Sequence, residues 1–140
     1  MTHVLLPTVA LLRRRDLVEV IGEALLAKAV DASRGHRRIA AWLGLPASTV
    51  RGWLRRLAGR AELVRAHFTR LAVWLDPTAG PVCPRGSPFG DAVEAIGVAA
   101  VAAGRRLDLV AVPTSAWRLA AGASGGRLLG NTNAPFPAPW

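Results

Sequence analysis

The chain is poor in the residues that build disulfides and cysteine-rich metal sites. It has one cysteine, Cys83, among 140 residues, and it has no tyrosine. A single thiol excludes an intramolecular disulfide and a zinc site made of several cysteines. We therefore expect no metal and no cofactor. The low cysteine content favours a reducing, cytoplasmic compartment.

Long apolar runs are missing as well. Segment 95–103 is far shorter than the roughly 20 residues that a membrane-spanning helix needs. Residues 1–12 are apolar, but Pro7 interrupts them and the charges at 13–15 follow the run, whereas a signal peptide carries its charges first. We therefore expect a soluble protein of one domain with no membrane partner.

Acidic residues are scarce, and their absence is local. The chain has 18 Lys and Arg against 9 Asp and Glu, a net charge of +9 and a pI near 11.7. No acid lies between Asp31 and Glu62, yet this window holds Arg34, Arg37, Arg38, Arg51, Arg55, Arg56 and Arg60. Such a block attracts polyanions, and each neutralised phosphate contributes about −0.9 to the salt dependence of log K. Arginine-rich codon usage is an alternative source of the charge, but it does not explain the missing acids.

The same window carries a pattern typical of a helix-turn-helix. Two apolar stripes at helical spacing flank a short turn: Ile39, Ala40 and Leu43 come before it, and Val50, Trp53, Leu54 and Leu57 after it. Gly44 suits the positive φ that ends a helix, and Leu45 fills the corner. Pro46 suits the first turn of the next helix. The pattern predicts two helices that cross.

The outer side of the second predicted helix carries the candidate DNA contacts. We predict base contacts from Ser48, Thr49, Arg51 and Arg55, and phosphate contacts from Arg37, Arg38 and Arg56. An arginine paired with guanine discriminates by about 1–3 kcal/mol. Gly52 would let the backbone approach the groove. The alternative interpretation is an ordinary amphipathic helix with arginines in solvent.

The rest of the chain predicts an all-α fold with a tri-helical core, additional C-terminal helices and a loose tail. A capping box at Asp16–Glu19 starts the first helix. The predicted helices cover about 16–32, 36–43, 47–58, 61–75 and 91–103, with 107–112 extended or a helix end. The predicted regions are an N-terminal extended segment 1–15, the core with its following helix 16–76, a Pro/Gly linker 77–90, and a weakly specified helical region with a tail 91–140.

Two of these helices have predicted inward faces outside the basic window. They comprise Val18, Ile21, Leu25, Leu26 and Ala29 in the first helix, and Leu63, Val64, His67, Phe68, Leu71 and Trp74 in the fourth. His67 falls within an apolar stripe, so we expect a packed histidine rather than a ligand or a base.

Short motifs in a fixed order give the chain a family resemblance. They are Thr-His-Val-Leu-Leu-Pro at 2–7, Val-Glu-Val-Ile-Gly at 18–22, the helix pair at 43–56, and Gly-Gly-Arg-Leu-Leu at 125–129 with Asn131 and Thr132. In this order they resemble a family of bacterial helix-turn-helix proteins related to transposases, which usually carry an N-terminal zinc ribbon. The ribbon has no counterpart in this sequence, so the resemblance supplies no metal ligands.

The resemblance implies DNA binding connected with mobile elements, and it does not supply an enzyme. A transposase needs three carboxylates around two metal ions in a strand-rich fold. The acids after the motif lie on predicted helices or loops: Glu62, Asp76, Asp91, Glu94 and Asp108. We therefore predict a non-catalytic, nucleoid-associated protein without a small-molecule substrate. Its partner is double-stranded DNA, with a second copy or a transposase as further candidates.

Two alternatives stay open. The chain could be a protein interaction or dimerisation module whose basic block keeps it soluble, or a decayed remnant of a transposase-associated protein. A single module reads few base pairs, so a specific regulator of this type is expected to dimerise.

Overall fold

In a computed structural model, the described residues are 17–78, 82–107, 116–124, 128–129 and 136. Every regular element among them is helical, which confirms the all-α class. The elements are α2 (Leu17–Val30), α3 (His36–Leu43), α4 (Ala47–Leu75), α5 (Pro88–Leu107) and α6 (Ala116–Ala123). The predicted capping residue Asp16 and segment 1–15 lie outside the described residues, as do 108–112.

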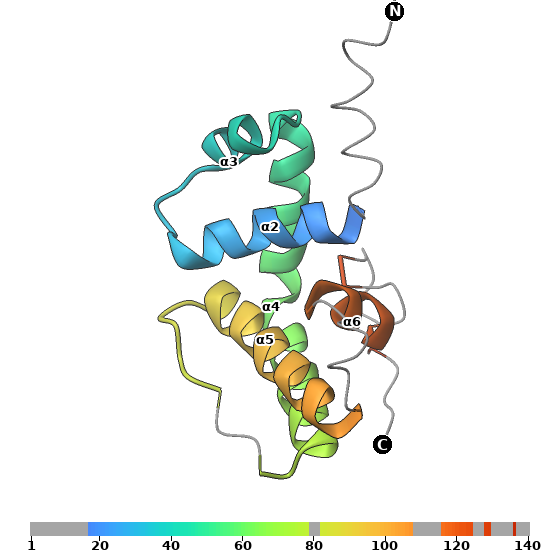
Figure 1. Ribbon diagram of the computed structural model, residues 1–140. Coiled ribbons are helices and arrows are strands. Elements are labelled where there is room, and N and C mark those ends of the chain that lie inside the picture. The colour runs from blue at the N-terminus through green and yellow to red at the C-terminus, as the bar shows by residue number, and fades with distance from the viewer. Residues whose placement is uncertain (1–16, 79–81, 108–115, 125–127, 130–135, 137–140) are drawn as a thin grey trace, which may run out of the picture.

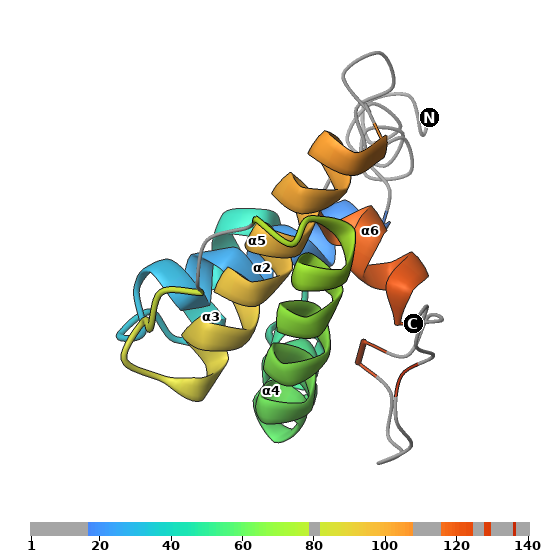
Figure 2. The same cartoon turned by 90° about the horizontal axis from the view of Figure 1, so that it is seen from below.

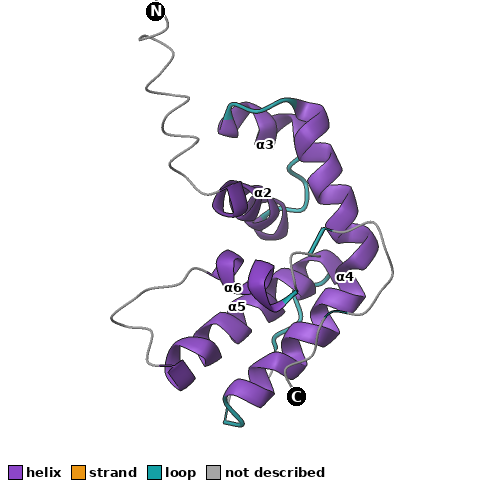
Figure 3. Cartoon of the chain, turned by 90° about the vertical axis from the view of Figure 1, so that its right-hand side faces the viewer, coloured by secondary structure: helices purple, strands orange, loops and turns teal. Residues whose placement is uncertain are grey.

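Helix α4 runs from one end of the molecule to the other along one side and bends near its middle (Figures 1 and 3). Its 29 residues measure about 43 Å along the path of the helix at 1.5 Å per residue. The prediction of two helices, 47–58 and 61–75, was wrong. Gly59 alone costs only about 1 kcal/mol in a helix. The buried stripe continues through Leu57, Ala61 and Val64 without a change of register, so burial keeps the helix intact.

Helix α5 runs beside the second half of α4 in the same direction. Phe89, at its start, lines the same hollow as Leu54 in the first half of α4. Arg105, near its end, reaches the Asp76 carboxylate just after α4, with 3.5 Å between Nη1 and Oδ2. Among the described residues, α4 and α5 form the most extensive contact between two elements. Figure 2 shows the two helices packed against each other.

The start of α5 corrects the predicted linker 77–90 and the predicted helix 91–103. The helix begins at Pro88, where a missing N–H costs nothing, and continues to Leu107. The Ser87 hydroxyl accepts a hydrogen bond from the Gly90 N–H at 3.0 Å. This cap was overlooked because Gly and Pro in the segment suggested irregular structure throughout. The alanine-rich helix is also well packed, since small side chains let it lie close to α4.

A single core joins the helices. Its fully buried members come from α2 through α6 and include Leu25, Ile39, Val50, Leu57, Val64, Phe68, Ala92, Ile96, Ala99 and Ala120. The predicted fourth-helix face is confirmed at Val64, His67, Phe68 and Leu71, all of which are buried, whereas Leu63 is only partly buried.

Two residues predicted to face inward are exposed. Leu26 is 47% exposed and Trp74 is 49% exposed. Helix α2 is apolar on nearly every side, so periodicity alone does not select its buried face, which instead carries Val20, Ala24 and Ala27. In the last turn of α4, Leu75 rather than Trp74 faces inward.

The C-terminal residues pack more closely than the predicted loose tail. Ser124, Leu128 and Phe136 are buried, and α6 was not predicted at all. The Phe136 ring lies edge-on to the His67 ring, with 5.1 Å between centroids. It also lies 4.9 Å from the guanidinium carbon of Arg60. These contacts pin residue 136 against the middle of α4.

The described helices include none with the length and apolar character required to span a membrane.

Candidate nucleic-acid interface

A tight turn joins α3 to α4. Gly44 adopts φ 70° and ψ 33°, the left-handed conformation that ends α3. The Leu45 N–H donates to the Ala40 carbonyl at 2.9 Å, and the Gly44 N–H donates to the Ala41 carbonyl at 3.3 Å. The positive φ predicted for Gly44 is confirmed. Glycine suits this position because a residue with a side chain would be strained at this φ.

Pro46 differs slightly from its predicted place. It stands immediately before α4, in an extended conformation, rather than within the first turn. Its carbonyl accepts hydrogen bonds from the N–H groups of Thr49 at 3.1 Å and Val50 at 3.3 Å. Because a residue before the helix donates no helical hydrogen bond, proline costs nothing there either.

The two predicted apolar stripes meet inside this corner, which we define as residues 36–57. Ile39, Val50 and Leu57 are completely buried, and Ala40, Trp53 and Leu54 are nearly so. Leu43 and Leu45 are partly buried against the same core. The inner face predicted from spacing is therefore confirmed, and it fixes which side of α4 faces away from the core.

The outer side of α4 holds two groups of predicted contacts. Ser48, Arg51 and Arg55 are exposed and share one face through i, i+3 and i+7 spacing. Thr49 is also exposed, but it lies on the other flank, which it shares with Arg56 seven residues later. The seven candidate side chains therefore do not form one strip.

The candidate phosphate contacts of α3 lie at its start. Arg37 and Arg38 are both exposed. The first turn of α3 contains no acid, and no side chain caps it. The N–H groups and dipole of a helix N-terminus attract anions, so the two arginines add to a favourable backbone field.

The five candidate arginines of the corner form no ion pair with a carboxylate of the described residues. They are Arg37, Arg38, Arg51, Arg55 and Arg56. Elsewhere in that part of the chain, four arginines pair with carboxylates: Arg65 with Glu62, Arg85 with Glu94, Arg105 with Asp76 and Arg118 with Glu19. The arginines of the corner thus keep their charge available to a ligand.

The loop before α3 is held by its own hydrogen bonds. Lys28 Nζ donates to the carbonyls of Ala32 at 2.7 Å and Arg34 at 3.0 Å. The Ser33 hydroxyl and then its N–H donate to the Asp31 carboxylate, and these bonds, helped by the charges of Arg34 and Arg38, lower the pKa of Asp31. The Arg34 guanidinium lies 5.3 Å from the centre of the exposed Trp42 ring.

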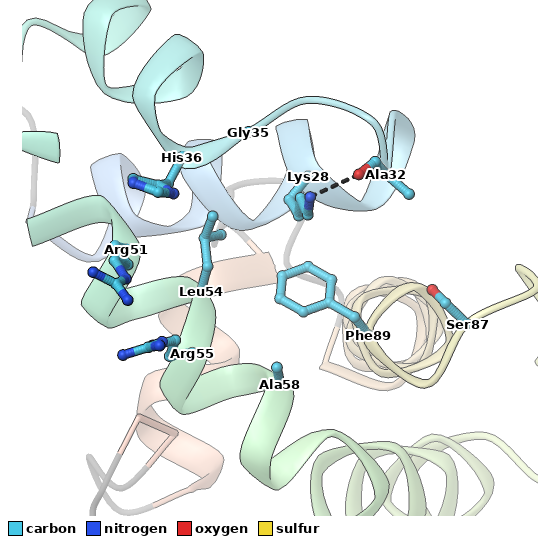
Figure 4. A pocket seen from close by; sticks show the side chains of 10 residues that line it. All are labelled: Lys28, Ala32, Gly35, His36, Arg51, Leu54, Arg55, Ala58, Ser87 and Phe89. Carbon is cyan, nitrogen blue, oxygen red and sulfur yellow. Dashed lines mark hydrogen bonds between the residues drawn. The ribbon is translucent and has the colours of Figure 1, made fainter. Parts of the chain in front are cut away.

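A hollow of about 420 Å³ lies beside the outer face of α4 (Figure 4). Arg51 and Arg55 line it together with His36, Lys28 and Phe89. Sequence reasoning did not include the last three residues in the site. Phe89 is distant in sequence, and only the parallel packing of α5 against α4 brings it there, so no local signal indicates it.

The described residues contain no group of three His, Cys, Asp or Glu side chains placed to hold a metal ion. Comparison of the chain with protein-family models, curated proteins and solved structures gave no match.

Proposed function

We propose that this chain binds double-stranded DNA, with α3 and the first part of α4 acting as a helix-turn-helix. The observation that carries the proposal is the corner itself. Its apolar stripes are buried, while Arg37, Arg38, Arg51, Arg55 and Arg56 are exposed and make no ion pair within the described residues. Cationic side chains on a protruding helix match the width and charge of the major groove.

In this proposal, residues 47–57 enter the major groove. Arg51 and Arg55 each offer two N–H groups to guanine O6 and N7, and Ser48 reaches a base edge from the same face. Gly52 lies between them, and a Cβ added there would meet no atom within 4 Å, so the glycine leaves open space toward the groove.

The remaining contacts hold the helix in place. Arg37 and Arg38 bind phosphates on one side of the groove from the start of α3, and Arg56 binds phosphate from the other flank of α4. Thr49, which shares that flank, contacts the base edge nearest to it. Phosphate contacts of this kind fix orientation, whereas base contacts carry sequence preference.

The role is non-catalytic and is either regulatory or connected with transposition, as the resemblance to transposase-related proteins implies. Helix α4 links a binding surface to the core in this proposal. The outer face of its first half is available to DNA, while its second half packs on α5. A cytoplasmic, nucleoid-associated location follows from the proposal.

Fluorescence anisotropy with a labelled duplex tests the proposal. A random-sequence duplex measures general affinity, and sequences selected from a random library measure preference. Arg38→Ala should weaken binding to all duplexes alike, whereas Arg51→Ala should weaken binding to the selected sequence more than to the random one.

Arg106→Ala is the matched control, since it removes the same charge from the exposed end of α5. If Arg106→Ala weakens binding as much as Arg51→Ala, net charge rather than the corner binds DNA, and the proposal is wrong.

A dimerisation module is the second candidate, and one observation favours it. Val73 and Trp74 are adjacent at the end of α4 and are 53% and 49% exposed. Light scattering after size exclusion, with and without duplex, measures the assembly. A Val73→Ser/Trp74→Ser variant that stays monomeric where the parent chain dimerises would establish this surface.

A further inference from the structure

The hollow beside α4 combines two chemistries that a DNA-reading surface does not need. Figure 4 shows Leu54 between His36, Arg51 and Arg55 on one side and Lys28 and Phe89 on the other. The lining therefore carries two arginines on one side of Leu54, and an aromatic ring with the Lys28 ammonium group on the other. Ala58 extends the apolar part of the wall along α4.

The described residues that line the hollow carry charge of one sign. Lys28, Arg51 and Arg55 are cations, and none of these lining residues carries a carboxylate. Lys28 Nζ spends two of its three N–H groups on the carbonyls of Ala32 and Arg34, so its position is fixed while its charge remains. Arg51 and Arg55 lie one helical turn apart on α4, and guanidinium groups at this spacing are well suited to a phosphate group.

The size and shape of the hollow favour a small molecule over a duplex. Its volume of about 420 Å³ is within the range of about 300–1,000 Å³ typical of small-molecule sites. The exposed arginines at its edge can meet a duplex, but the space between Leu54 and Phe89 is too narrow to admit a double helix. A ligand that fills it needs an anionic end for the arginines and a flat apolar end for Phe89 and Leu54.

We propose that this hollow binds a free nucleotide. The phosphate lies between Arg51 and Arg55, assisted by His36, and the base contacts Phe89 and Leu54. Bound there, the nucleotide occupies the two arginines proposed to read DNA, so it acts as a competing effector. The ligand site stands on the hollow alone, whereas the competition rests on the proposed DNA-binding function.

Isothermal titration calorimetry of the full chain tests the site with three probes: AMP, adenosine and inorganic phosphate. AMP should bind at least tenfold more tightly than either fragment, because only AMP satisfies both ends of the hollow. Arg51→Ala and Arg55→Ala should each weaken AMP binding about tenfold, the loss expected for a charge-assisted contact. Phe89→Ala should weaken AMP binding while leaving phosphate binding unchanged.

Arg106→Ala is the control for charge, since residue 106 lies 17 positions beyond Phe89, about 25 Å along α5. It should leave AMP binding unchanged. Circular dichroism checks the fold of every variant. Amide chemical-shift changes on adding AMP give a readout that needs no variant, and they should concentrate at Leu54, Ala58 and Phe89.

Three results would overturn the site: equal affinity for AMP and inorganic phosphate, AMP binding that survives both arginine substitutions, or shift changes elsewhere in the chain. Titrating AMP into the labelled protein–duplex complex then tests competition, and failure of saturating AMP to release DNA would overturn it. If AMP binds and DNA does not, the proposed DNA-binding function alone fails. If DNA binds and AMP does not, the nucleotide site alone fails.

Discussion

The two halves of α4 use arginine in different ways. In the corner, Arg51 and Arg55 are exposed and have no carboxylate partner among the described residues. Beyond Glu62, Arg65 pairs with a carboxylate on the same helix, and arginines on the neighbouring elements pair as well. The same residue type, on one continuous helix, thus has no carboxylate partner among the described residues at positions 51 and 55 but is paired at position 65.

A basic composition does not by itself make a basic site. A high arginine content raises the net charge everywhere, but partner carboxylates cancel it locally in the second half. Surface pairs of this kind contribute little to stability. They leave the corner with the largest group of exposed arginines that have no carboxylate partner among the described residues.

The largest expected effect comes from the buried core of the second half of α4. Phe68→Ala removes a completely buried ring that contacts the rings of His67 and Phe136. We expect a loss of about 3–5 kcal/mol in the free energy of unfolding, measured by urea denaturation followed by circular dichroism. Because α4 is continuous, the fluorescence of Trp53 in the corner should change in the same transition.

For that measurement every tryptophan except Trp53 is replaced. The Phe68→Ala variant is then compared with the chain that carries only these tryptophan replacements. Two separate transitions would show that the halves unfold independently, and the comparison would then describe two units rather than one.

Substitutions of arginine should separate the halves in DNA binding. Arg37→Ala/Arg38→Ala should reduce the slope of log K against log salt by about 1.8, which is 0.9 for each lost phosphate contact. Arg65→Ala/Arg85→Ala removes the same charge from paired positions and should leave the slope nearly unchanged. Anisotropy titrations over a series of salt concentrations give both slopes. If both double variants reduced the slope equally, pairing with a carboxylate would not keep an arginine from contacting phosphate.

Glycines of α4 offer a sharper test, because they separate stability from binding. A Cβ at Gly52 or at Gly59 would meet no atom within 4 Å, so alanine fits both positions. Each substitution should stabilise the helix by about 1 kcal/mol in urea denaturation. Only Gly52→Ala should weaken DNA binding, since Gly52 lies between the proposed base contacts while Gly59 lies two turns beyond it.

Gly59→Ala is therefore the matched control for Gly52→Ala. If the two variants bind DNA equally well, the backbone near residue 52 does not approach the groove, and the proposed docking of α4 needs a different face.

Local patterns predicted the corner well and the rest of the site poorly. The inner stripe, the left-handed Gly44 and the packed His67 all follow from spacing and residue type within a few positions. The spacing predicted a helix on each side of residues 59 and 60, but it did not show that burial continues through Leu57, Ala61 and Val64 and joins the two. Phe89 and Lys28 line the hollow because α5 and the last turn of α2 lie beside α4, an arrangement that only the tertiary structure determines.

The smallest expected effect concerns His67, a buried histidine in the second half of α4. Burial lowers the pKa of His67 below its usual 6.5, against a hydrogen bond with the Ala123 backbone that raises it, while the charge of Arg70 lowers it further. A histidine whose folded pKa lies below its unfolded value favours folding when neutral. Its contribution is therefore complete above the unfolded pKa and is lost as the pH falls from about 6.5 toward the folded pKa.

Urea denaturation between pH 5.5 and 7.5 measures this loss, and NMR titration of the His67 ring measures its pKa directly. His67→Gln should flatten the dependence of stability on pH, whatever its own absolute stability, because no titrating group remains at that position. DNA affinity, corrected for the folded fraction, should not change with the protonation of His67, because arginine side chains stay charged between pH 5.5 and 7.5. A ring that titrates at or above 6.5 would contradict the buried environment and, with it, the packing of Phe136 that closes this half of the molecule.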